Sequence, residues 1–235
     1  MNVNVAIIAG GLATRLRPLT ETVPKAMVPI HGRPFMEHQL ELLASNGFEE
    51  AVVLIGFLGE QIRDHFGDGS GFGLRLAYSE DGETLRGTGG ALRKALPLLT
   101  DPFLCIYGDS YLDVPYRPIL QDFLRGDARN EGLMTVYRNQ GLYDTSNVHF
   151  SDGRIVRYDK KDRTSEMKHI DWGLGILRKV AFDPFKARDT FDLAEVYENL
   201  VRRGVLQGFE VFERFYEVGS FDGIRDLEEK IGSSQ

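Results

Sequence analysis

The chain has 235 residues, 42% of them hydrophobic and 27% charged, a composition typical of a globular protein long enough for one large α/β domain. Its formal net charge of −7 argues against a general nucleic-acid surface, and no apolar stretch has the length that a bilayer span needs. We therefore expect a cytoplasmic protein without a nucleic-acid or membrane partner. The single cysteine, Cys105, excludes an intrachain disulfide and lies in an apolar run typical of a core.

Short apolar runs alternate with amphipathic helical patterns over the first half of the chain. Strands are expected at Val5–Ala9, Ala51–Ile55, Leu74–Tyr78 and Phe103–Tyr107, and helices at Pro34–Asn46, Gly59–Phe66 and Gly89–Leu96. This alternation predicts an α/β fold, a Rossmann-like three-layer α/β/α arrangement with a mostly parallel mixed sheet. Ligands bind such sheets at the carboxyl ends of the strands, which is where Gly10-Gly11 and Gly108-Asp109 fall.

The pattern changes from residue 132 onward, where strands become more frequent than helices. Strands are expected at Gly132–Arg138, Val148–Phe150, Arg154–Tyr158, Gly173–Leu177 and Gly208–Phe212, and a helix at Leu193–Arg203. The turn Ser151-Asp152-Gly153 predicts a hairpin between the second and third of these strands. No repeat or low-complexity linker divides the chain. We therefore expect a single domain, 1–235, with halves 1–131 and 132–235.

Residues 5–30, VAIIAGGLATRLRPLTETVPKAMVPI, form the densest motif. Gly10 and Gly11 follow a strand and let backbone N–H groups approach an anion closely. Arg15 can grip phosphate oxygens in a bidentate way, and Lys25 adds a point charge. The spacing matches neither the P-loop nor the G-x-G-x-x-G fingerprint, and no acidic residue follows at the distance that a dehydrogenase uses for ribose. The motif predicts a phosphate-binding loop of another class.

Three later segments carry further candidate groups. Leu85–Ala91, LRGTGGA, opens a helix, and its glycines and free N–H groups suit close approach of a ring or a sugar. Asp109 follows a buried strand in Tyr107–Ser110, and such a carboxylate beside a polyphosphate suits magnesium. Phe215–Ser220, FYEVGS, adds a second acid, Glu217.

These motifs, in this order and over nearly the whole chain, closely resemble the sugar-phosphate nucleotidylyltransferase family, whose signature is G-G-x-G-T-R-L-x-P-L-T followed by P-K. Ala13 stands where the family usually has glycine. The resemblance implies a GT-A-like nucleotidyltransferase fold and an Mg²⁺-dependent in-line attack of a sugar-1-phosphate on the α-phosphorus of an NTP, giving an NDP-sugar and pyrophosphate. No general base is needed, so catalysis rests on alignment and charge neutralisation.

The resemblance also implies a role for individual residues. Residues 1–131 would bind mainly the nucleotide and 132–235 mainly the sugar. Arg15 would hold the β- and γ-phosphates, and Lys25 would act at the α-phosphate and the sugar phosphate. The nucleotide-binding residues would be Ala9, Gly10, Gly11, Leu12, Ala13, Thr14, Gly87, Thr88, Gly89 and Gly90. The metal ligands would be Asp109 and Glu217, although the family has aspartate at the second position. The sugar-binding residues would be Tyr107, Gly108, Asn147, Lys161, Asp171 and Gly173, with Asp171 in place of the family's asparagine and Lys160 in place of its glutamate.

Two questions stay open at this point. Heptose- and mannose-1-phosphate guanylyltransferases resemble the chain most in texture, which favours GTP. The stretch Gly59–Tyr78 resembles muramate-1-phosphate uridylyltransferases, so uridylyl transfer to muramate- or hexose-1-phosphate is the alternative. A non-catalytic regulatory subunit that binds a sugar nucleotide is a further alternative, against which Arg15, Lys25 and Asp109 together count. The expected partners are the NTP and the sugar-1-phosphate, and a homo-oligomer is left open.

Overall fold

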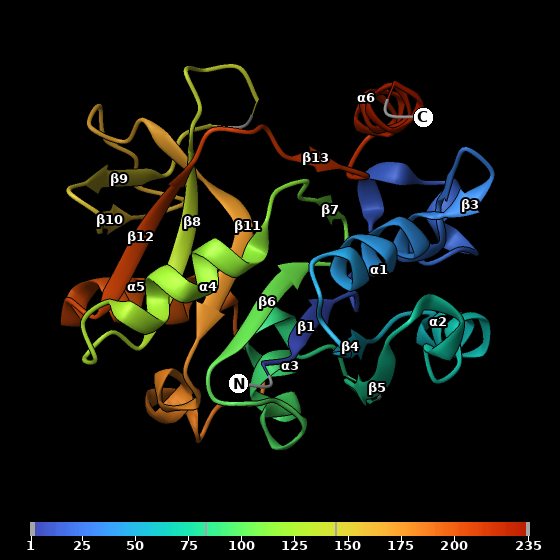
Figure 1. Ribbon diagram of the computed structural model, residues 1–235, viewed down its shortest axis with the longest axis horizontal. Coiled ribbons are helices and arrows are strands. Elements are labelled where there is room, and N and C mark those ends of the chain that lie inside the picture. Colours follow the sequence, from blue (N-terminus) through green and yellow to red (C-terminus); the bar gives the residue numbers. More distant parts are fainter. Residues whose placement is uncertain (1–2, 83, 144, 234–235) are drawn as a thin grey trace.

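The computed structural model describes residues 3–82, 84–143 and 145–233, and a nine-stranded mixed sheet runs through it (Figure 1). The strand order is β5-β4-β1-β6-β11-β8-β12-β10-β9. The strands are β1 (Val5–Ile8), β4 (Glu50–Ile55), β5 (Arg75–Glu80), β6 (Phe103–Tyr107), β8 (Gly132–Arg138), β9 (Val148–Ser151), β10 (Arg154–Tyr158), β11 (His169–Leu177) and β12 (Leu206–Val211). The first and second halves of the chain thus contribute to one continuous sheet.

Helices cover both faces of the sheet because strand side chains alternate between the faces. Val5 and Ile7 of β1 pack with α1, α2 and α4, whereas Ala6 packs with α3 and α5 on the opposite face. In Figure 1, α4 lies in front of the sheet and α5 behind it. The helices are α1 (Phe35–Ser45), α2 (Gly59–Phe66), α3 (Gly87–Ala95), α4 (Tyr116–Arg125), α5 (Leu193–Arg203) and α6 (Phe221–Gly232). Within the described residues, no helix combines the length and the apolar composition that crossing a bilayer requires.

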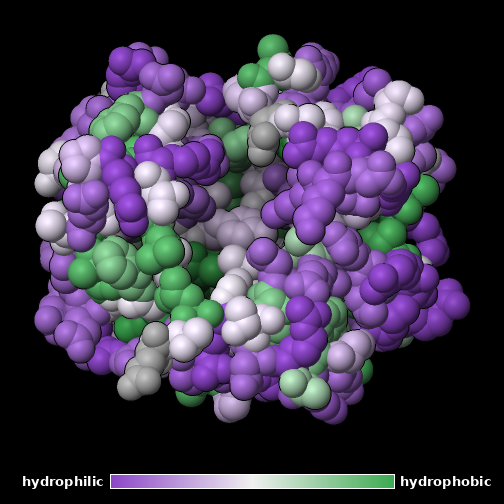
Figure 2. Space-filling view, turned by 180° about the vertical axis from the view of Figure 1, so that it is seen from behind, coloured by the Kyte–Doolittle hydropathy of each residue, from purple (hydrophilic) through white to green (hydrophobic). Residues whose placement is uncertain are grey.

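Short elements complete the fold. One two-stranded ladder joins β2 (Pro29–Ile30) to β3 (Arg33–Pro34), and another joins β7 (Ser110–Tyr111) to β13 (Tyr216–Glu217). The 3-10 segments are Thr14–Leu16, Leu19–Glu21, Lys25–Met27, Ser70–Phe72, Leu96–Leu98 and Lys179–Phe185. The space-filling view shows the surface hollowed near its centre, between two largely hydrophilic regions (Figure 2).

The expectation of a mostly parallel sheet is wrong. The strands β5, β4, β1 and β6 do pair in parallel, and so do β8 and β12. The pairings of β6 with β11, β11 with β8, β12 with β10, β10 with β9 and β11 with β9 are antiparallel, and they are the more numerous. Two successive strands can pair in parallel only if a long crossover connects them. The helices α1, α2 and α3 provide such connections in the first half of the chain. The tight turn at Asp152-Gly153 allows β9 and β10 to pair only as an antiparallel hairpin.

The other expected elements are confirmed, with ends that differ by a few residues. The helices α4 and α6 and the two small ladders were not predicted from the sequence. Pro118 argues against a helix, but it sits in the first turn of α4, where its missing N–H costs no intrahelical bond. Cys105 is a core residue as expected, and its burial raises the pKa of its thiol to about 12.

The close contact between β11 and α5 generates a stability prediction. A Cβ at Gly175 would overlap the Tyr197 hydroxyl and lie 3.2 Å from the Cys105 sulfur. Both neighbours are buried, so neither can move aside freely. We expect Gly175→Ala to lower the free energy of unfolding by about 1–3 kcal/mol in urea titrations. Gly71→Ala, with no heavy atom within 4 Å of its Cβ, is the control. Equal midpoints for the two variants would contradict the packing described here.

Candidate active site

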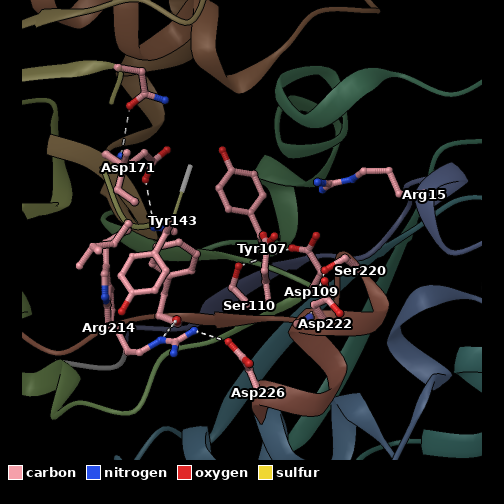
Figure 3. A pocket seen from close by; sticks show the side chains of 18 of the residues that line it. Arg15, Tyr107, Asp109, Ser110, Tyr143, Asp171, Arg214, Ser220, Asp222 and Asp226 are labelled. Carbon is pink, nitrogen blue, oxygen red and sulfur yellow. Dashed lines mark hydrogen bonds and ion pairs between the residues drawn. The ribbon is translucent and has the colours of Figure 1, made fainter. Parts of the chain in front are cut away.

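A cleft of about 720 Å³ opens beside the carboxyl ends of β1 and β6 and is lined by both halves of the chain (Figure 3). Among the residues expected at the site, it is lined by Arg15, Tyr107, Asp109, Asn147, Asp171, Gly173 and Glu217. A smaller cavity of about 150 Å³ adjoins it, because Tyr107 and Asp109 line both. The smaller cavity contains Ala9, Gly11, Ala13, Lys25, Thr88 and Gly108. Gly10, Leu12, Thr14, Gly87, Gly89, Gly90 and Lys161 line neither cavity.

The loop after β1 is shaped by one left-handed residue. Ala13 has φ 48°, and its carbonyl accepts a 2.7 Å hydrogen bond from the Thr20 hydroxyl. This residue leads into the short 3-10 turn that carries Arg15, whose side chain is directed toward the cleft (Figure 3). The left-handed backbone explains why glycine suits this position, and alanine adopts it at some cost in strain.

Asp109 is held by contacts on its backbone and on its side chain. The buried Gln39 of α1 donates from its side-chain amide to the carbonyls of Tyr107 (3.0 Å) and Ser110 (2.7 Å), on either side of Asp109. The Asp109 carboxylate accepts a 2.6 Å hydrogen bond from Lys25 Nζ, and the two side chains are 26% and 17% exposed. This half-buried ion pair joins the phosphate loop to the end of β6.

The ladder between β7 and β13 brings Glu217 to Asp109. Ser110 pairs with Glu217, and the Val218 N–H donates to the Asp109 carbonyl at 2.9 Å. A Cβ on Gly219 would lie 3.0 Å from a Glu217 carboxylate oxygen and 3.1 Å from an Arg15 guanidinium nitrogen. Glycine at 219 therefore leaves room for the acid and the arginine to approach each other.

The candidate magnesium ligands fit a hard cation in number and chemistry. Both line the cleft, Asp109 from the turn before β7 and Glu217 from β13, which pairs with β7. Among the described residues there is no cluster of three or more acidic, histidine or cysteine side chains for a metal. Magnesium needs no such cage, because it takes one or two carboxylates and fills its shell with substrate phosphates and water. The Asp109 carboxylate forms an ion pair with the Lys25 ammonium group, so it lies where a positive charge is accommodated.

The far end of the cleft has hydrogen-bonding groups suited to hydroxyls. A register shift in β11 lies between Asp171 and Gly175, and Gly173 has φ 103°. The Asp171 carboxylate accepts the Gly173 N–H at 3.0 Å, and Asn147 accepts the Asp171 N–H at 3.4 Å. Burial raises the pKa of the Asp171 carboxyl, and the charge of Lys160 opposes the shift. The buried Trp172 lines the cleft and donates its indole N–H to the Glu213 carbonyl.

Lys160, rather than the expected Lys161, lines the cleft. The Asp159 carboxylate accepts the backbone N–H groups of Lys161 and Asp162, each at 2.8 Å, and so forms a tight turn after β10. Lys161 does not line the cleft, and its charge acts on Glu195 and Glu198 of α5. The contact of Lys161 with a sugar phosphate stays a prediction, and of the two lysines it is Lys160 that lines the cleft.

The glycines of the second motif serve packing against the chain itself. The N–H groups of Gly89 and Gly90 both donate to the Phe191 carbonyl, at 3.0 and 3.1 Å. A Cβ at Gly87 would lie 2.6 Å from that carbonyl oxygen. The expectation of free N–H groups at these two glycines is wrong, since segment 189–192 takes them. Thr88 donates to Asp192 at 2.7 Å, yet it still lines the smaller cavity.

Several residues that line the cleft were not predicted from the sequence, chiefly Arg163, Arg214 and Tyr143. Arg214 directly precedes the Phe215–Ser220 motif, which contains the candidate metal ligand Glu217. This position in the sequence could have marked Arg214 as a site residue. No motif marks Arg163 or Tyr143, because each comes from a turn or loop whose course depends on the tertiary fold.

The family model described as nucleotidyl transferase matches residues 4–233. The chain belongs to this family, and the predicted family and enzyme class are thereby confirmed.

Curated relatives of similar sequence act on different substrates. The chain is 30% identical over 215 residues to UTP–glucose-1-phosphate uridylyltransferase of Synechocystis, covering 85% of this chain and 55% of that protein. It is 29% identical to N-acetylmuramate alpha-1-phosphate uridylyltransferase of Neisseria meningitidis, covering 97% of both chains. It is 28% identical to D-glycero-alpha-D-manno-heptose 1-phosphate guanylyltransferase of Campylobacter jejuni, covering 85% and 89%. The chain thus spans little more than half of one relative and nearly all of another.

Solved structures share the fold at lower identity. HddC from Yersinia pseudotuberculosis, complexed with GMP-PN, superposes with a TM-score of 0.79 at 23% identity over 97% of this chain and 99% of that one. A UDP-glucose pyrophosphorylase complexed with UDP-glucose gives 0.79 at 16% identity over the full length of both chains. These matches establish an α/β nucleotidyltransferase fold.

The left-handed Ala13 leads to a second prediction. An L-residue in this conformation costs about 1–2 kcal/mol, and glycine relieves it while adding freedom to the unfolded chain. We expect Ala13→Gly to raise the free energy of unfolding by up to about 1 kcal/mol in urea titrations. Ala44→Gly, inside α1, is the matched control and should lower it by about 0.5–1 kcal/mol. Equal losses in the two variants would rule out strain at Ala13.

Proposed function

We propose that the protein transfers a nucleotidyl group from an NTP to a sugar-1-phosphate, releasing pyrophosphate. The observation that supports this most directly is the position of Asp109, which lines both cavities, pairs with Lys25 and adjoins Glu217. A reaction that joins two phosphate-bearing substrates needs its charged groups at the point where the two sites meet. The proposal keeps a single domain, with residues 1–131 mainly around the nucleotide and 132–235 mainly around the sugar.

The parallel strands suggest how the nucleotide lies. Strands β5, β4, β1 and β6 end at one edge of the sheet, with the Gly10-Gly11 loop after β1 and Asp109 after β6. A triphosphate over this loop places its α-phosphate near Lys25 and its outer phosphates near Arg15. The sugar phosphate then approaches from the side of β11, past Lys160. Lys25 neutralises charge at the α-phosphate, and the attacking phosphate oxygen needs no base.

For the nucleobase, our proposal is guanine. A cavity of about 400 Å³ lies after β4 and β5, next to the loop after β1, and Glu60, Glu80 and Asp81 are among its lining residues. A guanine edge presents N1–H and N2–H donors to such acceptors, whereas uracil presents one N–H. This chemistry favours GTP, in line with the guanylyltransferase relative. The two uridylyltransferase relatives make UTP the alternative that the assay must separate.

Magnesium is the proposed cofactor, held by Asp109 and Glu217. When bound, the ion would supply positive charge to the phosphates. The two carboxylates would hold the ion where the two cavities meet. Lys25 would then be released from its ion pair with Asp109 and would neutralise charge at the α-phosphate.

The proposed function predicts pyrophosphate release that depends on one pair of substrates. The assay combines GTP, UTP, CTP, ATP and dTTP with a panel of sugar-1-phosphates, with and without magnesium. We expect the highest turnover with GTP, and a loss of about a hundredfold or more in Lys25→Ala, because charge stabilisation at the transition state is removed. Preferential turnover of UTP would overturn the guanine proposal. Silence over the whole panel in a protein that binds NTP would favour the regulatory alternative.

The metal proposal predicts different effects for neighbouring acids. Asp109→Asn should lower turnover by about a hundredfold or more, and Glu217→Ala should raise the magnesium concentration needed for half-maximal rate. Glu217→Asp, which restores the family's residue, should stay active. Asp113→Asn is the control, because Asp113 pairs with Lys230 and does not line the cleft. An unchanged magnesium dependence in Glu217→Ala would place the second ligand elsewhere.

A further inference from the structure

The cleft has more cationic side chains than a sugar ring requires. Besides Arg15, it is lined by Lys160, Arg163 and Arg214. A neutral sugar needs hydrogen-bonding partners for its hydroxyls, and Asp171 and Asn147 already supply them there. The proposed route of the sugar phosphate uses Lys160, which leaves two arginines without a role in the reaction.

Arg214 is held in a fixed orientation. Its guanidinium carbon lies 4.6 Å from the ring centre of Tyr143 and 4.4 Å from that of Tyr216, and Figure 3 shows Tyr143 beside it. One terminal nitrogen, Nη2, donates to Asp226 at 2.8 Å, and Nε lies 3.4 Å from the Phe215 carbonyl. The other terminal nitrogen, Nη1, has no hydrogen bond within the described residues. Aromatic clamping of a planar guanidinium orients its remaining N–H groups toward a ligand with little loss of freedom on binding.

Arg163 adds a second cation to the lining of the same cleft. Its Nε donates to the Lys160 carbonyl at 3.2 Å, and it forms no ion pair within the described part of the chain. Among the acids that line the cleft, Asp226 pairs with Arg214, Asp222 pairs with Arg225, and the Asp171 carboxylate accepts the Gly173 N–H. The N–H groups that Arg163 and Arg214 do not share with other described residues are suited to an anion.

We propose that the sugar-1-phosphate carries a second anionic group, a carboxylate or a phosphate away from C1, which Arg214 and Arg163 bind. The inference rests on the proposed function and names the class of its sugar substrate. In Figure 3 Arg214 lies well away from Arg15, with Asp109 between them, so the second anion and the nucleotide phosphates occupy opposite ends of the cleft. Bidentate contact from an arginine suits both carboxylate and phosphate.

Three matched pairs of sugar phosphates test the proposal. They are glucose 1-phosphate with glucuronic acid 1-phosphate, N-acetylglucosamine 1-phosphate with N-acetylmuramate 1-phosphate, and mannose 1-phosphate with mannose 1,6-bisphosphate. In each pair one member carries the additional anion, and the first two pairs test a carboxylate while the third tests a phosphate. We expect at least one acidic member to exceed its neutral partner in kcat/KM by about tenfold to a hundredfold, the effect of a charge-assisted hydrogen bond.

Substitution of the arginines links the preference to these residues. Arg214→Gln and Arg163→Gln should each raise KM for the preferred acidic sugar about tenfold while kcat and the rate with the neutral partner stay near those of the parent protein. Arg129→Gln, an exposed arginine paired with Asp127 outside the cleft, is the control. Thermal unfolding of each variant identifies loss of folding, and the second arginine keeps the test valid if one variant fails to fold.

The possible failures are distinguishable. Turnover of neutral sugar phosphates as fast as, or faster than, all three acidic partners would overturn this inference and leave the proposed function in place. A preference for an acidic sugar that survives both substitutions would also overturn the role of the arginines. No pyrophosphate with any pair, from a protein that binds NTP, would overturn the proposed function and this inference with it.

Discussion

The backbone turn at Gly108-Asp109 is held from two sides, and the arrangement of the cleft depends on it. The Gln39 side chain binds the carbonyls on either side of the turn, and the Val218 N–H binds the carbonyl of Asp109. The absence of a side chain at Gly108 lets the end of β6 approach the end of β1, where a Cβ would lie 2.8 Å from the Ile8 carbonyl oxygen. Because the turn is fixed, Lys25 pairs with the Asp109 carboxylate, and Glu217 lies on the strand that pairs with Ser110.

The cleft combines charges of both signs. Its cations are Arg15, Lys160, Arg163 and Arg214, and its acids are Asp109, Asp171, Glu217, Asp222 and Asp226. The chain carries a formal net charge of −7, which repels anionic substrates at long range. Arg15 and Arg214 lie at separate ends of the cleft with Asp109 between them (Figure 3). Under the proposed function, anionic substrates are therefore held at short range, by Arg15 and Arg214 within the cleft.

The elements and site residues that could be predicted from the sequence are those whose sequence pattern lies within a few neighbouring residues. β6 and α5 were predictable because apolar runs and helical periodicity lie within a few residues, and Asp109 because it directly follows a buried strand. The strand directions in the second half depend on which distant strands become neighbours, which no local pattern encodes. The family resemblance implies Lys161 as a sugar-binding residue. The turn stabilised by Asp159 instead leaves Lys160 lining the cleft. The contacts that fix Arg214 span parts of the chain far apart in sequence.

The hydrogen bonds from Gly89 and Gly90 to Phe191 join the start of α3 to a segment of the second half. Thr88 strengthens this junction, since its hydroxyl binds Asp192 and accepts the Leu193 N–H at the start of α5. A chimaera that imports residues 132–235 from a relative to change the sugar would also replace the support of this helix start. Such a chimaera would therefore disturb the start of α3, beside the smaller cavity that Thr88 lines, unless segment 189–192 is retained from the original chain.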